Sequence, residues 1–187
     1  MLISLRSAFF KVVGISHRLF NPALPEARLT SDSRLLASKH IMGMMNDLEL
    51  LKQRLRGIYS ETTIEHIVHP RNTQEIPNPD GFALSQSGCN EVMKIWLKVR
   101  NDSVVDSGFW TNGCAATIAC GSMATELAKG KAIAEALALT AEDIARALVD
   151  LPEGNFHCAE LAAGTLRIAL TDCLSTQQQP WKKLYRK

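Results

Sequence analysis

The chain has 187 residues, of which 46% are hydrophobic and 21% charged, and its formal net charge at pH 7 is +2. This composition is typical of a globular domain, and so small a net charge gives no support for a nucleic-acid-binding protein. No run of about 18 apolar residues occurs, so the sequence predicts no membrane span.

The first part of the chain differs in charge from the rest. Residues 1–40 contain six Lys or Arg, two acidic residues and six serines, whereas residues 41–187 carry 15 basic and 17 acidic side chains. A basic, acid-poor head of this kind resembles an organellar transit peptide. A start codon annotated upstream of the true one, which would lie near Met42, Met44 or Met45, also explains it.

Either explanation places the head outside the fold. We therefore predict a disordered N-terminal extension over residues 1–45, a folded domain over 46–176 and a polar tail over 177–187. The expected compartment is the cytoplasm, or the mitochondrial matrix if the head is a transit peptide.

The domain begins with a helical pattern. Apolar side chains recur at helical spacing over residues 46–56, and Ser60 can cap a second helix that Pro70 ends. The segment 73–88 is rich in Pro, Asn, Asp and Gly, and it predicts a loop.

Two strands follow the loop. The sequence EVMKIWLKV (91–99) alternates apolar and polar side chains, RNDS (100–103) is typical of a turn, and VVDSGFWTNG (104–113) predicts a second strand. The two strands are expected to form an antiparallel hairpin.

The remainder is predicted to be helical. Helix-forming residues dominate from Cys114 to Gly130, which closes that helix. Thr140 caps the next helix, whose apolar positions are expected at Ile144, Leu148 and Val149, and a final helix is predicted over 156–174. Helix, short antiparallel sheet and further helices give an α+β fold, a small sheet packed against several helices.

The five cysteines argue against a disulfide framework, because their number is odd and their spacing wide, and a reducing compartment is expected. They are Cys89, Cys114, Cys120, Cys158 and Cys173. Cys120 and Cys173 lie inside predicted helices, and we expect them to be buried in the core.

The other three cysteines lie where predicted elements begin. Cys89 precedes the first strand, Cys114 opens a helix, and Cys158 opens the last helix beside His157. The start of a helix favours a thiolate over a thiol, and thiolates bind soft metals. A single cysteine is nevertheless more often a small buried residue than a ligand. Because no CxxC pair occurs, spacing alone identifies neither a zinc ribbon nor a thioredoxin-like site.

Four segments in order carry a family resemblance: YSETTIEHIVHPRN, GCNEVMKIWLKV, GFWTNGCAATIACGSMATELAKGK and HCAELAAGTLRIAL. From Ile58 to Cys173 the chain resembles the iron–sulfur cluster assembly scaffolds of the IscU and NifU N-terminal type. The resemblance implies the SufE/NifU-type α+β fold with about three strands. It also implies a non-enzymatic scaffold that assembles a [2Fe–2S] cluster from iron and persulfide sulfur and transfers it to apo-proteins.

The resemblance also assigns the site residues. Cys89, Cys114 and Cys158 match the cysteines that hold the nascent cluster, iron or zinc, and Cys158 matches the cysteine that accepts persulfide sulfur from a cysteine desulfurase. His157 is a candidate fourth ligand. Glu91 stands where the family usually has aspartate, and it is a further candidate ligand. Cys114 is expected to be exposed, with small neighbours that leave space for a cluster.

Two departures from the family pattern bear on this assignment. Cys89-Asn90-Glu91 replaces Cys-Gly-Asp, which lengthens the carboxylate arm and lets it reach in or swing away. LPEGN (151–155) replaces Leu-Pro-Pro-Val-Lys, the docking tract of a dedicated Hsp70 chaperone, so the change argues against that partner. The partners that the resemblance implies are a cysteine desulfurase and apo iron–sulfur proteins.

Two other functions stay open at this point. In a zinc-dependent sulfurtransferase of the same fold, Cys89, Cys114 and either Glu91 or His157 would hold Zn²⁺ while Cys158 relays sulfur. A divergent paralogue that no longer assembles clusters would act as a binding or regulatory module.

Overall fold

The structure is a computed structural model that describes residues 47–149 and 151–178. The chain divides into two units, Met1–Met45 and Asn46–Lys187, and only the second contains described residues. The predictions for the extension over 1–45 and for residues 179–187 of the tail therefore lie outside the described residues. Within the described part, no helix combines the length and the apolar character needed to cross a membrane.

The domain opens with helical segments, as the pattern predicts. Residues 47–55 are helical, and α3 (Glu61–Val68) follows after a turn. The Ser60 side chain accepts a hydrogen bond from the backbone N–H of Thr63 (3.1 Å), which satisfies one of the free donors at the start of α3. Ile64 and Ile67 form the buried face of this helix.

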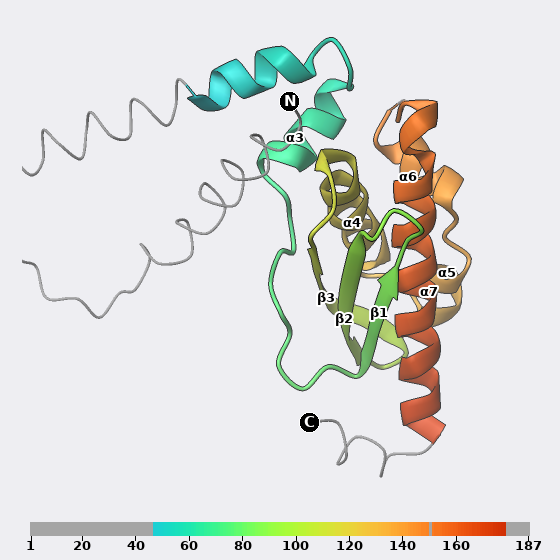
Figure 1. Ribbon diagram of the computed structural model, residues 1–187. Coiled ribbons are helices and arrows are strands. Elements are labelled where there is room, and N and C mark those ends of the chain that lie inside the picture. Colours follow the sequence, from blue (N-terminus) through green and yellow to red (C-terminus); the bar gives the residue numbers. More distant parts are fainter. Residues whose placement is uncertain (1–46, 150, 179–187) are drawn as a thin grey trace, which may run out of the picture. The chain divides into compact units, whose positions relative to one another are not determined.

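Three antiparallel strands form one sheet in the order β1-β2-β3 (Figure 1). They are β1 (Gly81–Gln86), β2 (Val92–Arg100) and β3 (Ser103–Thr111). The predicted hairpin is confirmed as β2–β3. Its two turn residues, Asn101 and Asp102, have φ values of 50° and 60°, the left-handed pair that a tight hairpin turn requires and that Asn and Asp tolerate best.

The prediction of a loop over 73–88 is wrong for residues 81–86, which form β1. Gly81 and Ala83 are buried while Phe82 and Leu84 are exposed, so the segment does alternate. The Pro, Asn and Gly residues on both sides hide this short pattern. A Cβ on Gly81 would lie 2.2 Å from the carbonyl oxygen of Ala169, so glycine is what allows β1 to approach the last helix.

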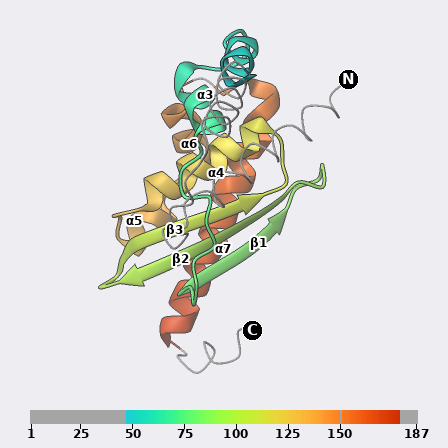
Figure 2. The ribbon, with the colours of Figure 1, turned by 90° about the vertical axis from the view of Figure 1, so that its left-hand side faces the viewer.

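Helices cover one face of the sheet (Figure 2). They are α4 (Ala115–Ala128), α5 (Ile133–Leu137), α6 (Ala141–Ala147), the short 3₁₀ helix η1 (Glu153–Asn155) and α7 (Phe156–Gln178). Contact with α4 and α7 buries Met93, Ile95 and Phe109 on the inner face of the sheet. The predicted α+β fold is confirmed.

Three details of the helical region differ from expectation. A five-residue helix, α5, was not predicted, because it is too short to show a 3.6-residue period. Val149 is 53% exposed rather than buried, since the chain leaves α6 at Leu148 and Val149 takes a left-handed φ of 53°. The last helix continues through Gln178, beyond the predicted end at 174. The cap of Thr140 on Asp143 is as predicted.

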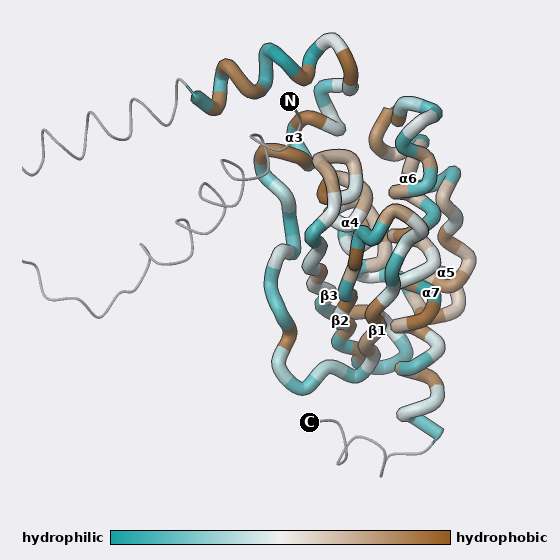
Figure 3. Tube along the Cα trace, in the orientation of Figure 1, coloured by the Kyte–Doolittle hydropathy of each residue, from teal (hydrophilic) through white to brown (hydrophobic). Residues whose placement is uncertain are grey.

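The connection from α3 to β1 crosses the outer face of the sheet. It is mostly hydrophilic (Figure 3), yet Ile76 within it is only 6% exposed. The backbone N–H of Phe109 donates to the carbonyl of Asn72 (2.8 Å), and a Cβ on Gly108 would lie 2.0 Å from the carbonyl oxygen of Gln74. The segment is therefore held against β3 by backbone contact.

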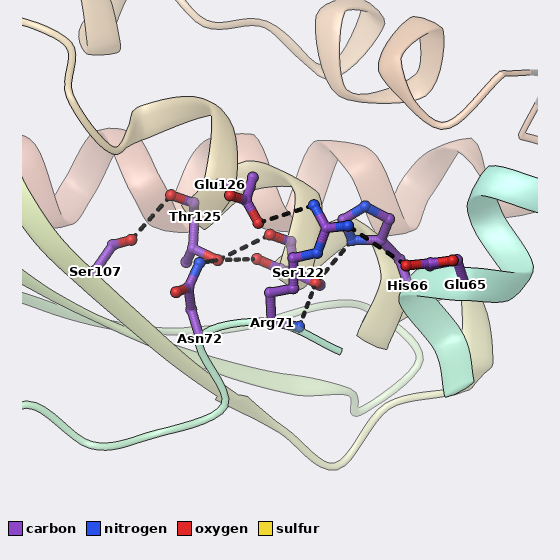
Figure 4. A network of polar contacts seen from close by, with 9 residues as sticks. Glu65, His66, Arg71, Asn72, Ser107, Ser122, Thr125 and Glu126 are labelled. Carbon is purple, nitrogen blue, oxygen red and sulfur yellow. Dashed lines mark hydrogen bonds and ion pairs between the residues drawn. The ribbon is translucent and has the colours of Figure 1, made fainter. Parts of the chain in front are cut away.

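A polar network ties α3 and this connection to α4 (Figure 4). The Ser122 hydroxyl on α4 accepts a hydrogen bond from the backbone N–H of Arg71 (2.9 Å) and forms another with Nδ1 of the buried His66 (2.8 Å). The Arg71 guanidinium pairs with Glu126 on α4 and Glu65 on α3. Burial lowers the pKa of His66, and the Arg71 cation lowers it further, so the imidazole stays neutral in the folded protein at neutral pH.

Candidate functional site

Three separate segments supply the residues of the candidate site. Cys89 lies in the turn between β1 and β2, and Glu91 directly precedes β2. Cys114 is the N-cap of α4, and His157 and Cys158 lie in the first turn of α7. The β2–β3 hairpin returns the chain so that the start of β2 and the start of α4 are neighbours: the backbone N–H of Val92 donates to the Asn112 side chain (2.7 Å).

The structure brings all five predicted site residues together. The sulfurs of Cys114 and Cys158 are 3.9 Å apart, and the Cys158 sulfur is 3.4 Å from Nε2 of His157. Ligand atoms of Glu91, Cys114 and Cys158 all lie within 4.8 Å of one another, and so do those of Cys89, Glu91 and His157. The two groups share Glu91. Four-coordinate zinc with Zn–S bonds of about 2.3 Å requires ligand atoms roughly 3.5–4 Å apart, so small movements would close either group around an ion.

Glu91 is buried and hydrogen-bonded at both carboxylate oxygens. Its side chain is 6% exposed, Oε1 accepts the backbone N–H of Cys114 (2.8 Å), and Oε2 accepts the hydroxyl of Thr117 (2.7 Å). Of the two positions expected for the longer arm, the structure shows the one that reaches in. The extra methylene lets both carboxylate oxygens reach the first turn of α4, where free N–H groups and the helix dipole favour negative charge.

The turn that carries Cys89 is built on Ser87 and Asn90. The Ser87 hydroxyl lies 3.0 Å from the Cys89 sulfur and accepts the backbone N–H of Glu91 (3.2 Å). Asn90 has a φ of 61°, a left-handed conformation that glycine adopts freely and asparagine tolerates better than most residues. Asn90 can therefore replace the glycine of the family pattern without changing the turn.

The three thiols differ in exposure. Cys89 is exposed and Cys158 is buried. Cys114 is half-buried, not exposed as expected, because Thr117 and Cys158 pack against its sulfur. His157, beside Cys158, is exposed.

Cys114 and Cys158 share a proton. The hydrogen bond from Cys158 lowers the pKa of Cys114 to about 6, against burial, which opposes the shift, and the Thr117 hydroxyl lowers it further. The same hydrogen bond and burial raise the pKa of Cys158. The pair therefore loses its first proton from Cys114, which gives a thiolate at the start of α4 and a thiol on α7 at neutral pH.

Two features of the site were not predicted from the sequence. Thr117 contacts Glu91, Cys114 and Cys158, and its position three residues after the N-cap is the only sequence signal for it. The second is Tyr59, whose hydroxyl accepts the side-chain N–H of Asn155 (2.7 Å). Burial raises the pKa of Tyr59, and the nearby Cys114 raises it further. Residues that are far apart in sequence form this contact, so no local pattern marks it.

The two cysteines assigned to the core are buried as expected. Cys120 and Cys173 have no exposed surface. Burial raises the pKa of Cys120, which remains a thiol. Neither belongs to the groups of candidate metal ligands found among the described residues.

Comparisons with known proteins agree on one family. Residues 58–179 match the family model of the NifU-like N-terminal domain. Over 116 residues the chain is 44% identical to iron-sulfur cluster assembly scaffold protein IscU 1 of Archaeoglobus fulgidus, which covers 62% of this chain and 76% of that protein. It is 38% identical over 146 residues to the iron-sulfur cluster assembly enzyme IscU of Drosophila melanogaster, with 72% and 94% covered.

A solved structure supports the fold. A putative iron-sulfur cluster assembly scaffold protein for the SUF system from Fervidobacterium islandicum superposes with a TM-score of 0.53 at 23% identity. The match covers 60% of this chain and 96% of that chain. At this level of identity the likeness concerns the arrangement of strands and helices, and it agrees with the sheet and helices described above.

Proposed function

Because the chain belongs to the family of NifU-like N-terminal domains, we propose that it is a scaffold on which an iron–sulfur cluster is assembled and from which it is transferred. The observation that supports the proposal is that Glu91 has two groups of candidate ligands around it, Cys114 with Cys158 and Cys89 with His157, although these residues lie on three separate segments. The curated relatives are named as assembly proteins, which favours a scaffold over the sulfurtransferase and the regulatory paralogue.

The donor set suits a cargo that must leave again. Thiolates are soft ligands for iron, whereas a carboxylate oxygen is hard and an imidazole nitrogen is intermediate. Four buried cysteines would retain a cluster, but here one cysteine is exposed, one is half-buried, and Glu91 and His157 complete the set. We propose that a [2Fe–2S] cluster is the cargo and that Zn²⁺ is an alternative occupant of the same donors.

Cys158 is our proposed acceptor of persulfide sulfur. In this step its sulfur attacks the outer sulfur of a persulfide on a cysteine desulfurase, a new S–S bond forms, and the desulfurase cysteine leaves as a thiolate. Nε2 of His157, 3.4 Å from the Cys158 sulfur, can take the thiol proton. Because Cys158 is buried, the first turn of α7 has to move before the desulfurase persulfide reaches it.

The remaining partners follow from this role. The recipients would be apo iron–sulfur proteins, and the scaffold itself would be a carrier rather than an enzyme. The LPEGN segment argues against a dedicated Hsp70 chaperone. Its Asn155 donates to the hydroxyl of Tyr59, which lies just before α3. All five cysteines are free, which supports a reducing compartment such as the cytoplasm or the mitochondrial matrix.

Anaerobic reconstitution tests the function. The full chain is incubated with ferrous iron, a cysteine desulfurase and cysteine, and the visible absorbance is followed. We expect a cluster spectrum from the parent and none from Cys114→Ser, because a neutral hydroxyl replaces a thiolate. Cys173→Ser, a buried position remote from the ligand set, is the matched control and should reconstitute. Tight zinc binding and persulfide formation without a cluster would instead indicate the sulfurtransferase.

A further inference from the structure

One side chain contacts three of the proposed ligands without being one itself. Thr117 is the third residue of α4, and it has no exposed surface. Its hydroxyl oxygen lies 2.7 Å from Oε2 of Glu91, 3.3 Å from the Cys158 sulfur and 3.3 Å from the Cys114 sulfur. Its neighbours in the first turn, Ala115 and Ala116, carry no polar side-chain atom.

The hydroxyl has a single proton, and the geometry indicates where it goes. Oε2 of Glu91 lies 2.7 Å from the hydroxyl oxygen, and a carboxylate accepts a hydrogen bond more strongly than the thiol of Cys158 does. The hydroxyl also lies within hydrogen-bond distance of both sulfurs, so in the metal-free protein Glu91 and the two sulfurs compete for its one proton. A sulfur bound to a metal shares its charge with the ion and accepts a hydrogen bond less strongly, so Glu91 becomes the main partner of the hydroxyl once a metal is bound.

This hydrogen bond completes the fixation of Glu91. With Oε1 held by the backbone N–H of Cys114 and Oε2 by Thr117, the carboxylate is anchored at both oxygens. Each oxygen keeps a lone pair, and the carboxylate lies within 4.8 Å of both sulfurs. Without the hydroxyl, a glutamate with three side-chain torsions would keep one anchor and lose more conformational entropy on binding a metal.

We propose that Thr117 is a positioning residue of the metal site, which holds the Glu91 carboxylate where it can act as a ligand. The inference rests on the proposed function in that it assumes a metal bound by these side chains. It goes beyond that function because Thr117, which is not itself a ligand, is given control over the position of the ligand Glu91. Hydrogen-bond partners of metal ligands typically change metal affinity by about 10- to 100-fold when they are removed.

Anaerobic titration of the metal-free full chain with cobalt(II) tests the proposal. Cobalt reports both affinity and, through its visible spectrum, the number and kind of ligands. We expect Thr117→Val, which keeps the shape but removes the hydroxyl, to bind cobalt about tenfold more weakly. Its spectrum should become that of Glu91→Ala. Thr117→Ser keeps the hydroxyl, so it should restore both the affinity and the spectrum of the parent.

A double variant separates action through Glu91 from direct action on the sulfurs. If Thr117 acts through Glu91, Thr117→Val lowers the cobalt affinity no further when Glu91 is already alanine. Losses that multiply in the double variant would overturn the proposal. So would a valine variant with the affinity and spectrum of the parent, or a serine variant as weak as the valine variant.

Two controls keep these outcomes distinct. The thermal midpoint of each metal-free variant shows whether the fold is kept, and Thr117→Ala is a second hydroxyl-free variant if valine packs poorly. The titration requires no cluster assembly, so a protein that shows the expected cobalt results but cannot build a cluster would contradict the scaffold function and leave the role of Thr117 intact. A parent that binds no cobalt would overturn the metal site itself.

Discussion

The reactivity of Cys114 depends on its contact with Cys158. With a pKa of about 6, Cys114 in the metal-free protein is mostly thiolate at pH 6.5, whereas a cysteine of ordinary pKa, about 8.5, is about 1% thiolate there. The change that tests this is Cys158→Ala, which removes the sulfur that contributes the largest lowering of the Cys114 pKa.

The expected difference in alkylation rate between the parent and the variant follows from two opposing effects. At pH 6.5 the thiolate fraction of Cys114 is about 75-fold higher than that of an ordinary cysteine. Nucleophilicity falls as pKa falls, with a Brønsted coefficient of about 0.45, and a difference of about 2.5 units reduces the intrinsic rate roughly 13-fold. The parent should therefore be alkylated at Cys114 about sixfold faster at pH 6.5 than a variant in which the pKa has returned to its ordinary value.

Iodoacetamide labelling of the metal-free protein, read at Cys114 by peptide mass spectrometry between pH 5 and 9.5, measures both the pKa of Cys114 and its alkylation rate. In the parent, the rate should rise with a midpoint near the pKa of about 6 and then level off. In Cys158→Ala the rate should keep rising through pH 8. A parent whose Cys114 rate still climbs above pH 8 would refute the shared proton.

Three further predictions concern the stability of the metal-free protein, measured by urea unfolding. Glu91→Ala leaves the Cys114 N–H and the Thr117 hydroxyl without their charged acceptor, so it should lower the free energy of unfolding by about 2–3 kcal/mol; a loss below about 0.5 kcal/mol would contradict the anchoring of Glu91. Because the pKa of the buried His66 is lowered in the fold, the unfolded chain binds more protons below about pH 6.5, so the free energy of unfolding should fall as the pH drops from 7 towards 5. His66→Gln should flatten this pH dependence, and an unchanged pH dependence in that variant would contradict the lowered pKa of His66. Gly121→Ala would bring a Cβ within 2.5 Å of the Phe109 ring and should lower the free energy of unfolding by about 1–3 kcal/mol. Gly164→Ala, with open space around it on α7, should be neutral or stabilising by up to about 1 kcal/mol. Equal effects at both positions would contradict the close packing of α4 on the sheet.

The parts of the fold that local sequence encodes were predictable. Alternation in 91–99 and the Asn101-Asp102 turn are sufficient for the hairpin, since each feature acts within a few residues. The small helix-forming residues from Ala115 onward predict α4 for the same reason. In contrast, β1 is stabilised by pairing with β2 and by contact with α7, and its own six residues lie among turn-forming neighbours.

The site was predictable only in part. The sequence places Cys89, Cys114 and Cys158 at element boundaries. That all three belong to one site was predicted from the family resemblance, since it depends on the packing of α7 against the sheet, which local patterns do not encode. The fixation of Glu91 and the Tyr59–Asn155 contact arise from tertiary structure, 23 to 96 residues apart in sequence. Local patterns carry no information on such contacts.

Cluster transfer is the most direct test of the scaffold assignment. The reconstituted full chain is mixed anaerobically with an apo-ferredoxin in the presence of a ferrous chelator, and circular dichroism follows the appearance of the ferredoxin cluster. The ferredoxin should gain its cluster while the chelator traps little iron, because the cluster passes directly from Cys89, Cys114 and Cys158 to the acceptor. If the chelator takes the iron and the ferredoxin stays empty, the chain is not a transfer scaffold.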